Sequence, residues 1–354
     1  MDNTAFIKAL EAICEEKKID KEVIFEAMEL ALSSAYKKNF DSKTNVRVDI
    51  NKTTGEIKVF SVLHVVKEIP EEENIDKYIL AKDVKGKKVG DIIEEEVTPK
   101  DFGRVSAATA KQVLIQKVRE AERGSIMNEF EDKQDELLVG IVSREDTSNY
   151  YIDLGRAHGV LPKTELINNE TIVMGSSIKV YVTKIEDNGK APLILLSRTH
   201  YGFLKRLLEN QIPELKDGTI KLFSIARDPG NRSKIAVYSE NSKVDAIGAC
   251  IGERGSRINN IVKEINNEKI DIILYDKDPT KFIKNSLSPA KDINVIIIDD
   301  KNNHAIVIAE GEQLSLAIGK LGQNVRLASR LTKFKIDIKS KEQLEKEGIT
   351  IKFE

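Results

Sequence analysis

Apolar residues near the start of the chain recur at three- and four-residue steps, the spacing of an amphipathic helix. In the stretch "KEVIFEAMELALSSAYKKNF" the recurring apolar positions are Val23, Ile24, Ala27, Met28, Ala31 and Ala35. Asp20 precedes this run and can cap the first turn. We predict a helix with this face buried. The next stretch, "NVRVDINKTTGEIKVF", alternates apolar and polar residues on both sides of a Thr-Gly turn, which is typical of a β-hairpin.

A long helical pattern begins near Pro99 and continues to about residue 133. If it is uninterrupted, some 30 residues of helix extend about 45 Å, which is too far for one small core to cover. Such a helix would act as a spacer or a docking surface. The alternative is an ordinary amphipathic helix that is interrupted at Gly124.

From Glu136 onward the pattern changes to short strands. They are "LLVGIVSRE", "NYYIDLGRAHGVLP", "SSIKVYVTKIE" and "PLILLSRT". Four or five strands within about 65 residues, with glycine turns between them, predict a small closed β-barrel of the OB type.

The stretch "YYIDL" in this region places one tyrosine on each face of a strand. Tyr150, Ile152 and Leu154 share the face that is the better candidate for the core. Tyr151 lies on the other face with Asp153. We expect Tyr151 either to be an exposed aromatic residue that stacks on a base or to pack on a neighbouring surface side chain.

The second half of the chain contains two copies of one pattern. Gly252 and Gly255 stand three apart in "CIGERGSRINNIVKEI", and Gly319 and Gly322 repeat the spacing 67 residues later in "AIGKLGQNVRLASRL". Each copy then reaches the same tetrapeptide, "KIDI", with an offset of 66 residues. In both, the pattern reads helix, strand, strand, helix, glycine loop, helix, strand. An internal duplication of one unit, a three-stranded sheet backed by helices, is the simplest interpretation.

The glycine loops are the candidate binding sites of these units. Glycine accepts a positive φ and allows another backbone to approach closely. Each loop opens a helix, whose free N–H groups and positive dipole end attract an anion such as a phosphate. The candidate binding residues for a phosphate backbone are Gly252, Glu253, Arg254, Gly255 and Arg257 in the first copy and Gly319, Lys320, Leu321, Gly322 and Arg326 in the second, and Tyr151 in the barrel is the candidate for base stacking.

Two isoleucines precede the loops, Ile251 and Ile318. They either pack inward or line a groove for bases, and we favour packing.

Composition excludes several other classes of protein. With 40% hydrophobic and 32% charged residues, the chain is typical of a charge-rich folded protein. No run approaches the roughly 18 apolar residues of a membrane span. The N-terminus has no basic-then-apolar signal pattern, so we expect a cytoplasmic protein with no membrane partner.

The cysteines, the histidines and the distribution of charge add expectations about thiols, metal binding and partners. Cys14 and Cys250 each lie within an apolar helical pattern, so we expect reduced, buried thiols. The four histidines are scattered and no zinc-ligand spacing occurs, so we predict no metal and no cofactor. The net charge of −2 hides a division, because residues 199–354 carry 26 basic and 22 acidic side chains, a net charge of +4. The remainder carries −6. A polyanionic partner for the second half is therefore permitted.

The repeated unit resembles the KH module, which clamps about four nucleotides of single-stranded nucleic acid at its GxxG loop. An S-one-type barrel followed by tandem KH modules, with "SIARDPGNRSKIAVYS", "GACIGERGSRI" and "LSLAIGKLGQNVRLAS", resembles the NusA family of bacterial transcription elongation and termination factors. The stretches "KEVIFEAMELALSSAYKKNF" and "DFGRVSAATAKQVLIQKVREAER" are similar to that family's polymerase-binding domain. Tyr151 matches an aromatic position of S-one barrels, whereas Ser148 and Pro162 stand where another aromatic residue and a histidine often occur.

The resemblance implies a multidomain α+β protein. The expected domains are a helix-rich N-terminal α/β polymerase-binding domain (residues 1–133), a five-stranded OB-type barrel (134–199), a first KH domain of α-β-β-α-α-β order (200–276), a second one (277–345) and a short tail (346–354). The implied partners are RNA polymerase, nascent single-stranded RNA and other Nus-type antitermination factors. The implied function is control of pausing, intrinsic termination and antitermination. The sequence lacks the acidic C-terminal repeats that some family members carry, so the regulation that they provide is either absent or depends on residues beyond Glu354.

Two other functions are weighed against this one. S-one and KH modules also accompany phosphorolytic exoribonucleases, but the first 133 residues are too few for that catalytic core. They contain no Walker loop, metal-carboxylate set or plausible Ser-His-Asp set, so we predict no catalytic residues and no enzyme activity. The second is an RNA-binding translation or ribosome-assembly factor with the same modules; only the N-terminal resemblance argues against it.

Overall fold

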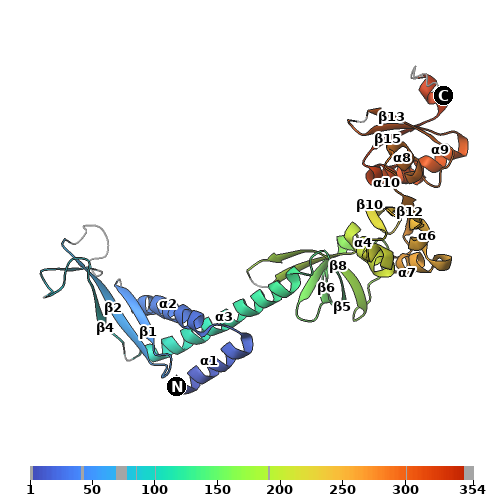
Figure 1. Cartoon of the computed structure of the whole chain (residues 1–354). Helices are drawn as coiled ribbons and strands as arrows, with labels where there is room; N and C mark the ends of the chain where they lie inside the picture. The colour runs from blue at the N-terminus through green and yellow to red at the C-terminus, as the bar shows by residue number, and fades with distance from the viewer. Residues whose placement is uncertain are drawn as a thin grey trace. The chain divides into compact units, whose positions relative to one another are not determined.

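The structure of the chain is a computed structural model. It describes residues 3–40, 44–68, 78–84, 86–99, 101–189, 192–299 and 301–346. The chain divides into two compact units, residues 1–128 and 129–354, whose elements are drawn in Figure 1. Among the described residues, none of the helices combines the length and apolar character that a bilayer span requires.

The first unit packs helices against a sheet. Its elements are α1 (Asn3–Lys17), α2 (Lys21–Asn39), β1 (Asn45–Ile50), β2 (Ile57–Val66), β3 (Tyr78–Leu80), β4 (Ile92–Glu96) and most of α3 (Phe102–Glu131). The β1–β2 pair is the expected antiparallel hairpin, and β2 also pairs with β3 and β4. Asp20 caps α2 as expected, because its carboxylate accepts the Glu22 N–H at 2.9 Å.

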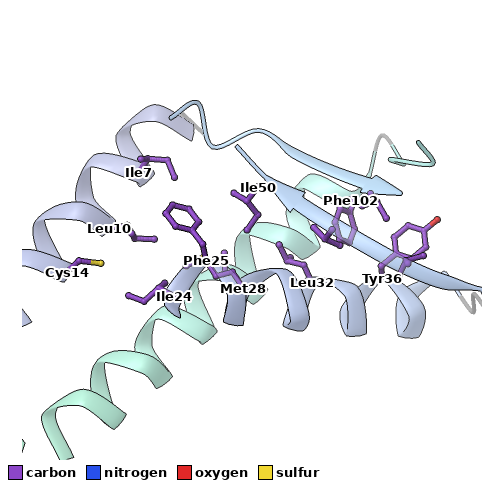
Figure 2. Packing of buried hydrophobic residues seen from close by; sticks show 14 residues of the cluster. Ile7, Leu10, Cys14, Ile24, Phe25, Met28, Leu32, Tyr36, Ile50 and Phe102 are labelled. Carbon is purple, nitrogen blue, oxygen red and sulfur yellow. The ribbon is translucent and has the colours of Figure 1, made fainter. Parts of the chain in front are cut away.

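The buried face of α2 differs from the predicted one. It consists of Ile24, Phe25, Met28, Leu32 and Tyr36. Val23, which the pattern placed on this face, is 46% exposed. The face is centred on the largest apolar side chains because their burial removes the most apolar surface from water. Figure 2 shows these side chains meeting α1, β1 and Phe102 of α3 in one core.

The helix α3 is continuous over 30 residues. It passes through Gly124 without a break, so the alternative of an interrupted helix is wrong.

The second unit begins with a closed five-stranded barrel, as predicted. Its strands are β5 (Leu137–Glu145), β6 (Asn149–Asp153), β7 (His158–Pro162), β8 (Ser177–Asp187) and β9 (Pro192–Ser197), with the 3₁₀ turn η2 (Lys163–Glu165) after β7. The strands close in the order β5-β6-β7-β9-β8. Ile152 is fully buried inside the barrel, as its face predicted, whereas Tyr150 and Leu154 are half-buried.

Two KH units follow the barrel, each with a three-stranded sheet. The first contains α4 (Tyr201–Gln211), α5 (Pro213–Lys216), β10 (Lys221–Asp228), β11 (Arg232–Tyr238), α6 (Ala246–Ile251), η3 (Glu253–Gly255), α7 (Ser256–Glu264) and β12 (Lys269–Leu274). The second contains α8 (Pro279–Ser286), β13 (Asn294–Asp299), β14 (His304–Ile308), α9 (Gly311–Ile318), η4 (Lys320–Gly322), α10 (Gln323–Thr332) and β15 (Lys335–Lys339), and α11 (Lys341–Lys346) follows it.

The two sheets have the same topology. The middle strand pairs antiparallel with the strand before it and parallel with the strand that carries "KIDI". This agreement confirms the α-β-β-α-α-β order and the duplication that the spacing predicted.

Candidate nucleic-acid interface

The two glycine loops have the same backbone. The first glycine has φ 76° and ψ 172° at Gly252, and φ 74° and ψ 171° at Gly319. The third residue of each loop is left-handed although it is not glycine, with φ 52° at Arg254 and φ 51° at Leu321. The last glycine of each loop is left-handed too. Two sequences with different middle residues therefore fold into one loop shape.

The first glycine of each loop is required by space as well as by φ. A Cβ at Gly319 would lie 2.9 Å from the backbone nitrogen of Asn324, and one at Gly252 would lie 2.7 Å from the Arg257 side chain. In contrast, a Cβ at Gly322 would meet nothing closer than 4.0 Å. The helix that follows each loop thus packs directly against the loop's first glycine.

The middle residues of both loops point into solvent. Glu253, Arg254 and Lys320 are exposed, and Leu321 is 90% exposed. The helices α7 and α10 begin directly after the loops, so their first N–H groups and positive dipole ends lie beside these side chains. The first loop carries one acid and one base, whereas the second carries only a base.

Arg257 is held inside the first KH unit. Its Nη1 donates to the Glu214 carboxylate at 2.8 Å and to the Ala249 carbonyl at 2.7 Å. These contacts tie α7 to α5 and α6. A contact between Arg257 and RNA remains a prediction, and it would compete with these internal bonds.

The second KH unit places Asn324 where the first has Arg257, five residues after the first glycine of the loop. Its amide nitrogen donates to the carbonyls of Leu287, Leu316 and Ala317 at 3.0, 3.1 and 3.2 Å. The side-chain oxygen of Asn324 is buried without a hydrogen-bond partner. Sequence reasoning missed this residue, although its equivalence to Arg257 follows from the 67-residue offset.

Arg326 and the isoleucines before the loops are more open. The Arg326 side chain is 51% exposed, with its guanidinium 3.8 Å from the Asp228 carboxylate. Ile318 is half-buried, but Ile251 is 38% exposed. Our expectation that Ile251 packs inward is therefore wrong. It ends a short helix at the loop, where the core beneath is already filled by the buried Cys250.

Tyr151 of the barrel does not present a free ring. The Arg144 guanidinium lies 3.9 Å from the centre of its ring, and its hydroxyl donates to Asp146 at 2.8 Å. That hydrogen bond, together with those from the Ser148 and Asn149 N–H groups, lowers the pKa of Asp146 to about 2. The packed-tyrosine alternative matches this geometry, and base stacking by Tyr151 remains a prediction.

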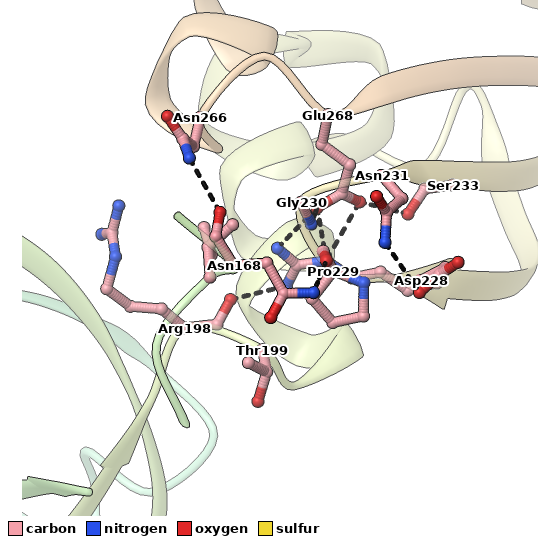
Figure 3. A network of polar contacts seen from close by, with 12 residues as sticks. Asn168, Arg198, Thr199, Asp228, Pro229, Gly230, Asn231, Ser233, Asn266 and Glu268 are labelled. Carbon is pink, nitrogen blue, oxygen red and sulfur yellow. Dashed lines mark hydrogen bonds and ion pairs between the residues drawn. The ribbon is translucent and has the colours of Figure 1, made fainter. Parts of the chain in front are cut away.

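A buried polar network joins the barrel to the first KH unit. Arg227 of β10 forms a buried ion pair with Glu268 at 3.0 Å and donates to the carbonyls of Arg198 and His200, both at 2.8 Å. Figure 3 shows Glu268 also receiving the Gly230 N–H, at 3.0 Å. Because every charged group in this network is paired, the network fixes the orientation of the barrel on the first KH unit.

The two KH units are joined by an apolar cluster with polar contacts at its rim. Leu327 and Leu331 of α10 pack against Ala226 and Ala236 on the sheet of the first unit. At one edge, the fully buried Lys234 donates to the Ser288 carbonyl at 2.8 Å and pairs with Asp271 at 3.0 Å. Burial lowers the pKa of Lys234, and the Asp271 carboxylate opposes that shift.

Each of the two cysteines lies in a hydrophobic core. Cys14 and Cys250 are free and buried, as predicted. Burial raises the pKa of the Cys250 thiol to about 11, so the thiol is neutral at physiological pH. Within the part of the chain that the structure describes, no three His, Cys, Asp or Glu side chains are grouped to hold a metal ion.

Three models of known families match parts of this architecture. Residues 5–124 match the model of the NusA N-terminal domain, residues 198–275 that of the NusA-like first KH domain, and residues 279–346 that of the NusA-like second KH domain. The transcription termination/antitermination protein NusA of Halalkalibacterium halodurans is 47% identical over 98% of this chain and 91% of its own length. The chain belongs to the NusA family.

Other relatives in the NusA family align over similar lengths. NusA of Bacillus subtilis is 47% identical over 98% of this chain and 94% of its own. NusA of Thermus thermophilus is 39% identical over 96% of this chain and 91% of its own. The family resemblance stated from the sequence is thereby confirmed.

Proposed function

We propose that this protein is a transcription elongation factor that binds RNA polymerase and nascent single-stranded RNA and modulates pausing, intrinsic termination and antitermination. The observation that carries this proposal is the pair of loops at Gly252–Gly255 and Gly319–Gly322. Both have the same left-handed backbone, expose their middle residues and begin a helix. Such a loop suits the sugar-phosphate backbone of a single strand.

The N-terminal unit is the proposed contact with RNA polymerase. Its match to the NusA N-terminal domain supports this role. A tether to polymerase near the emerging transcript raises the effective concentration of RNA at the barrel and the KH units, so individually weak contacts act together. Other Nus-type factors are further proposed partners, and action on nascent RNA places the protein in the bacterial cytoplasm.

The proposal assigns no catalytic step to the chain. Binding energy alone favours folding of a hairpin in the emerging RNA, and this prolongs pauses. Incubation of the purified protein with labelled RNA, magnesium and phosphate should therefore leave the RNA length unchanged. Processive shortening that survives repurification would favour an exoribonuclease instead.

The deciding experiment compares the full chain with its Arg254→Asp, Lys320→Asp double variant in a purified transcription assay. Both substituted side chains are exposed, so the fold should be retained. The natural chain should prolong a hairpin pause, and the variant should still associate with polymerase but prolong it less. Co-purification with ribosomes rather than polymerase would instead favour the translation or ribosome-assembly alternative.

A further inference from the structure

An aromatic stack lies at the rim of the junction between the two KH units. The rings of Phe223 and Tyr275 are stacked with their centres 3.8 Å apart. Phe223 also meets Phe282 of α8 edge-on at 5.6 Å, and Tyr238 flanks Tyr275 at 5.4 Å. Although Tyr275 packs on its ring, Phe223 remains 46% exposed.

The stack results from an irregularity in β10. The register between β10 and β11 shifts between Leu222 and Ser224, so Phe223 has no partner in the ladder. A strand residue released in this way changes the direction of its side chain. Phe223 thereby meets Phe282, which belongs to the cluster beneath α10. An exposed aromatic residue held in a fixed orientation is a ready platform for a nucleobase.

A stripe of cations follows the neighbouring helix. Arg326, Arg330 and Lys333 are exposed. Arg326 and Arg330 stand four residues apart on one face of α10, and Lys333 follows as the left-handed residue that ends the helix. The stripe covers about 10 Å of helix and begins one turn beyond the second glycine loop. Within the described residues, Arg330 and Lys333 form no ion pair, and Arg326 lies 3.8 Å from the Asp228 carboxylate.

A hydrogen bond joins the strand that carries Phe223 to the end of the helix that carries the stripe. The Ser224 hydroxyl donates to the Leu331 carbonyl at 2.9 Å, which fixes the end of α10 against β10. Ser224 is adjacent to Phe223, and Leu331 is two residues before Lys333. Figure 1 shows α10 beside β10 at this junction.

The acidic residues near the stack are engaged in local turns. The Asp276 carboxylate accepts the Asp278 N–H at 2.9 Å, and Asp278 caps α8 by accepting the Thr280 N–H at 2.9 Å. Exposed Lys277 and Lys281 stand in the same segment. Their two positive charges balance those of Asp276 and Asp278, so residues 276–281 carry no net charge.

We propose that single-stranded RNA leaving the second glycine loop follows Arg326, Arg330 and Lys333 along α10 and stacks a base on Phe223. This inference rests on the proposed RNA-binding function and adds to it a separate site at the KH junction. Cations hold the backbone phosphates and thus position the strand, and the aromatic ring accepts any base because every base has a π-face.

The absence of tryptophan from the chain allows a direct test in the full-length protein. Phe223→Trp places one fluorophore on the stack, and a base that stacks on it should quench its emission. Phe40→Trp in the N-terminal unit is the matched control, because Phe40 is 40% exposed and packs on Tyr36 at 5.0 Å. The probe is a 12-nucleotide RNA with a terminal dye, whose anisotropy reports binding independently of quenching.

Saturable quenching of Phe223→Trp, with none for Phe40→Trp, is the expected result. The Arg330→Glu, Lys333→Glu double variant should weaken binding about tenfold and lower the salt slope by about 0.7 for each phosphate that the protein no longer neutralises. Lys301→Glu reverses one charge at an exposed turn of the second KH unit. This control should alter neither the affinity for RNA nor the salt slope.

Each other outcome has a distinct meaning. Normal anisotropy with no quenching at Phe223→Trp shows that RNA binds elsewhere and overturns the inference while the proposed function stands. Absence of any RNA binding by the natural chain overturns the proposed function itself. If Phe223→Trp lowers the unfolding temperature, Phe223→Leu provides a second measurement, because it retains apolar packing but should weaken RNA binding by removing the ring.

Discussion

Arg257 and Asn324 occupy equivalent positions in the two KH units and bind equivalent carbonyls. Each follows the first glycine of its loop by five residues, and each donates to the carbonyl three residues before that glycine. The acceptors are Ala249, at 2.7 Å from Arg257, and Leu316, at 3.1 Å from Asn324. A guanidinium and an amide thus make the same link between the helix before the loop and the helix after it.

Removal of the Asn324 link should destabilise the second KH unit. In Asn324→Ala the carbonyls of Leu287, Leu316 and Ala317 lose their shared donor inside the core. We expect a loss of about 2–3 kcal/mol in the free energy of unfolding, the cost of leaving buried acceptors unsatisfied. Urea denaturation measures this loss. Asn260→Ala, at an exposed position of α7, serves as the control. Equal stability of the two variants would contradict a clamping role.

The two glycines of the second loop should differ in their tolerance of alanine. At Gly319 an added Cβ meets the Asn324 backbone at 2.9 Å, and φ 74° with ψ 171° is a conformation nearly restricted to glycine. Gly319→Ala should cost about 1–3 kcal/mol or more in unfolding free energy. A Cβ at Gly322 would have open space, so only the left-handed φ opposes alanine there. Gly322→Ala should therefore lower the free energy of unfolding by about 1–2 kcal/mol. Thermal unfolding measures the difference. If Gly322→Ala lowers the unfolding temperature as much as Gly319→Ala does, crowding at Gly319 is unimportant.

The sequence predicted the loops well because their requirements are local. A positive φ demands glycine at Gly252 and Gly319, and the duplication repeats that demand at a fixed offset. The role of Arg257 was not visible in the same way, because its partner Glu214 lies 43 residues away and is brought near only by folding. For the same reason, the pattern did not reveal that Arg144 packs on Tyr151 or that Phe223 leaves the ladder of its strand.

The acid in the first loop should weaken RNA binding relative to the second loop. Glu253 and Lys320 are equivalent, exposed positions, so one presents a negative charge where the other presents a positive one. Glu253→Lys should tighten binding of single-stranded RNA several-fold and steepen its salt dependence by about 0.7. Filter binding across a salt series provides the measurement. Glu312→Lys, an exposed acid in the first turn of α9, is the control for net charge. If both substitutions tighten binding equally, the effect is one of total charge and not of the loop.

The buried ion pair of Arg227 and Glu268 allows two effects on stability to be compared, the removal of one charge and the removal of both. Both side chains are nearly inaccessible, at 2% and 0% exposure, and Glu268 also accepts from Ser233 and Gly230. Glu268→Ala leaves a buried guanidinium without its counter-charge, so the free energy of unfolding should fall by about 3–5 kcal/mol. The Arg227→Met, Glu268→Leu double variant removes both charges, and its stability should recover much of that loss.

The double variant also tests what the pair does for the junction. Arg227 donates to the carbonyls of Arg198 and His200, and methionine cannot replace those directional bonds. We therefore expect the double variant to be stable but to exchange the amide hydrogens of residues 198–200 faster than the natural chain. Hydrogen exchange followed by mass spectrometry measures this difference. Unchanged protection at these residues would mean that apolar packing alone, and not the charged network, holds the barrel on the first KH unit.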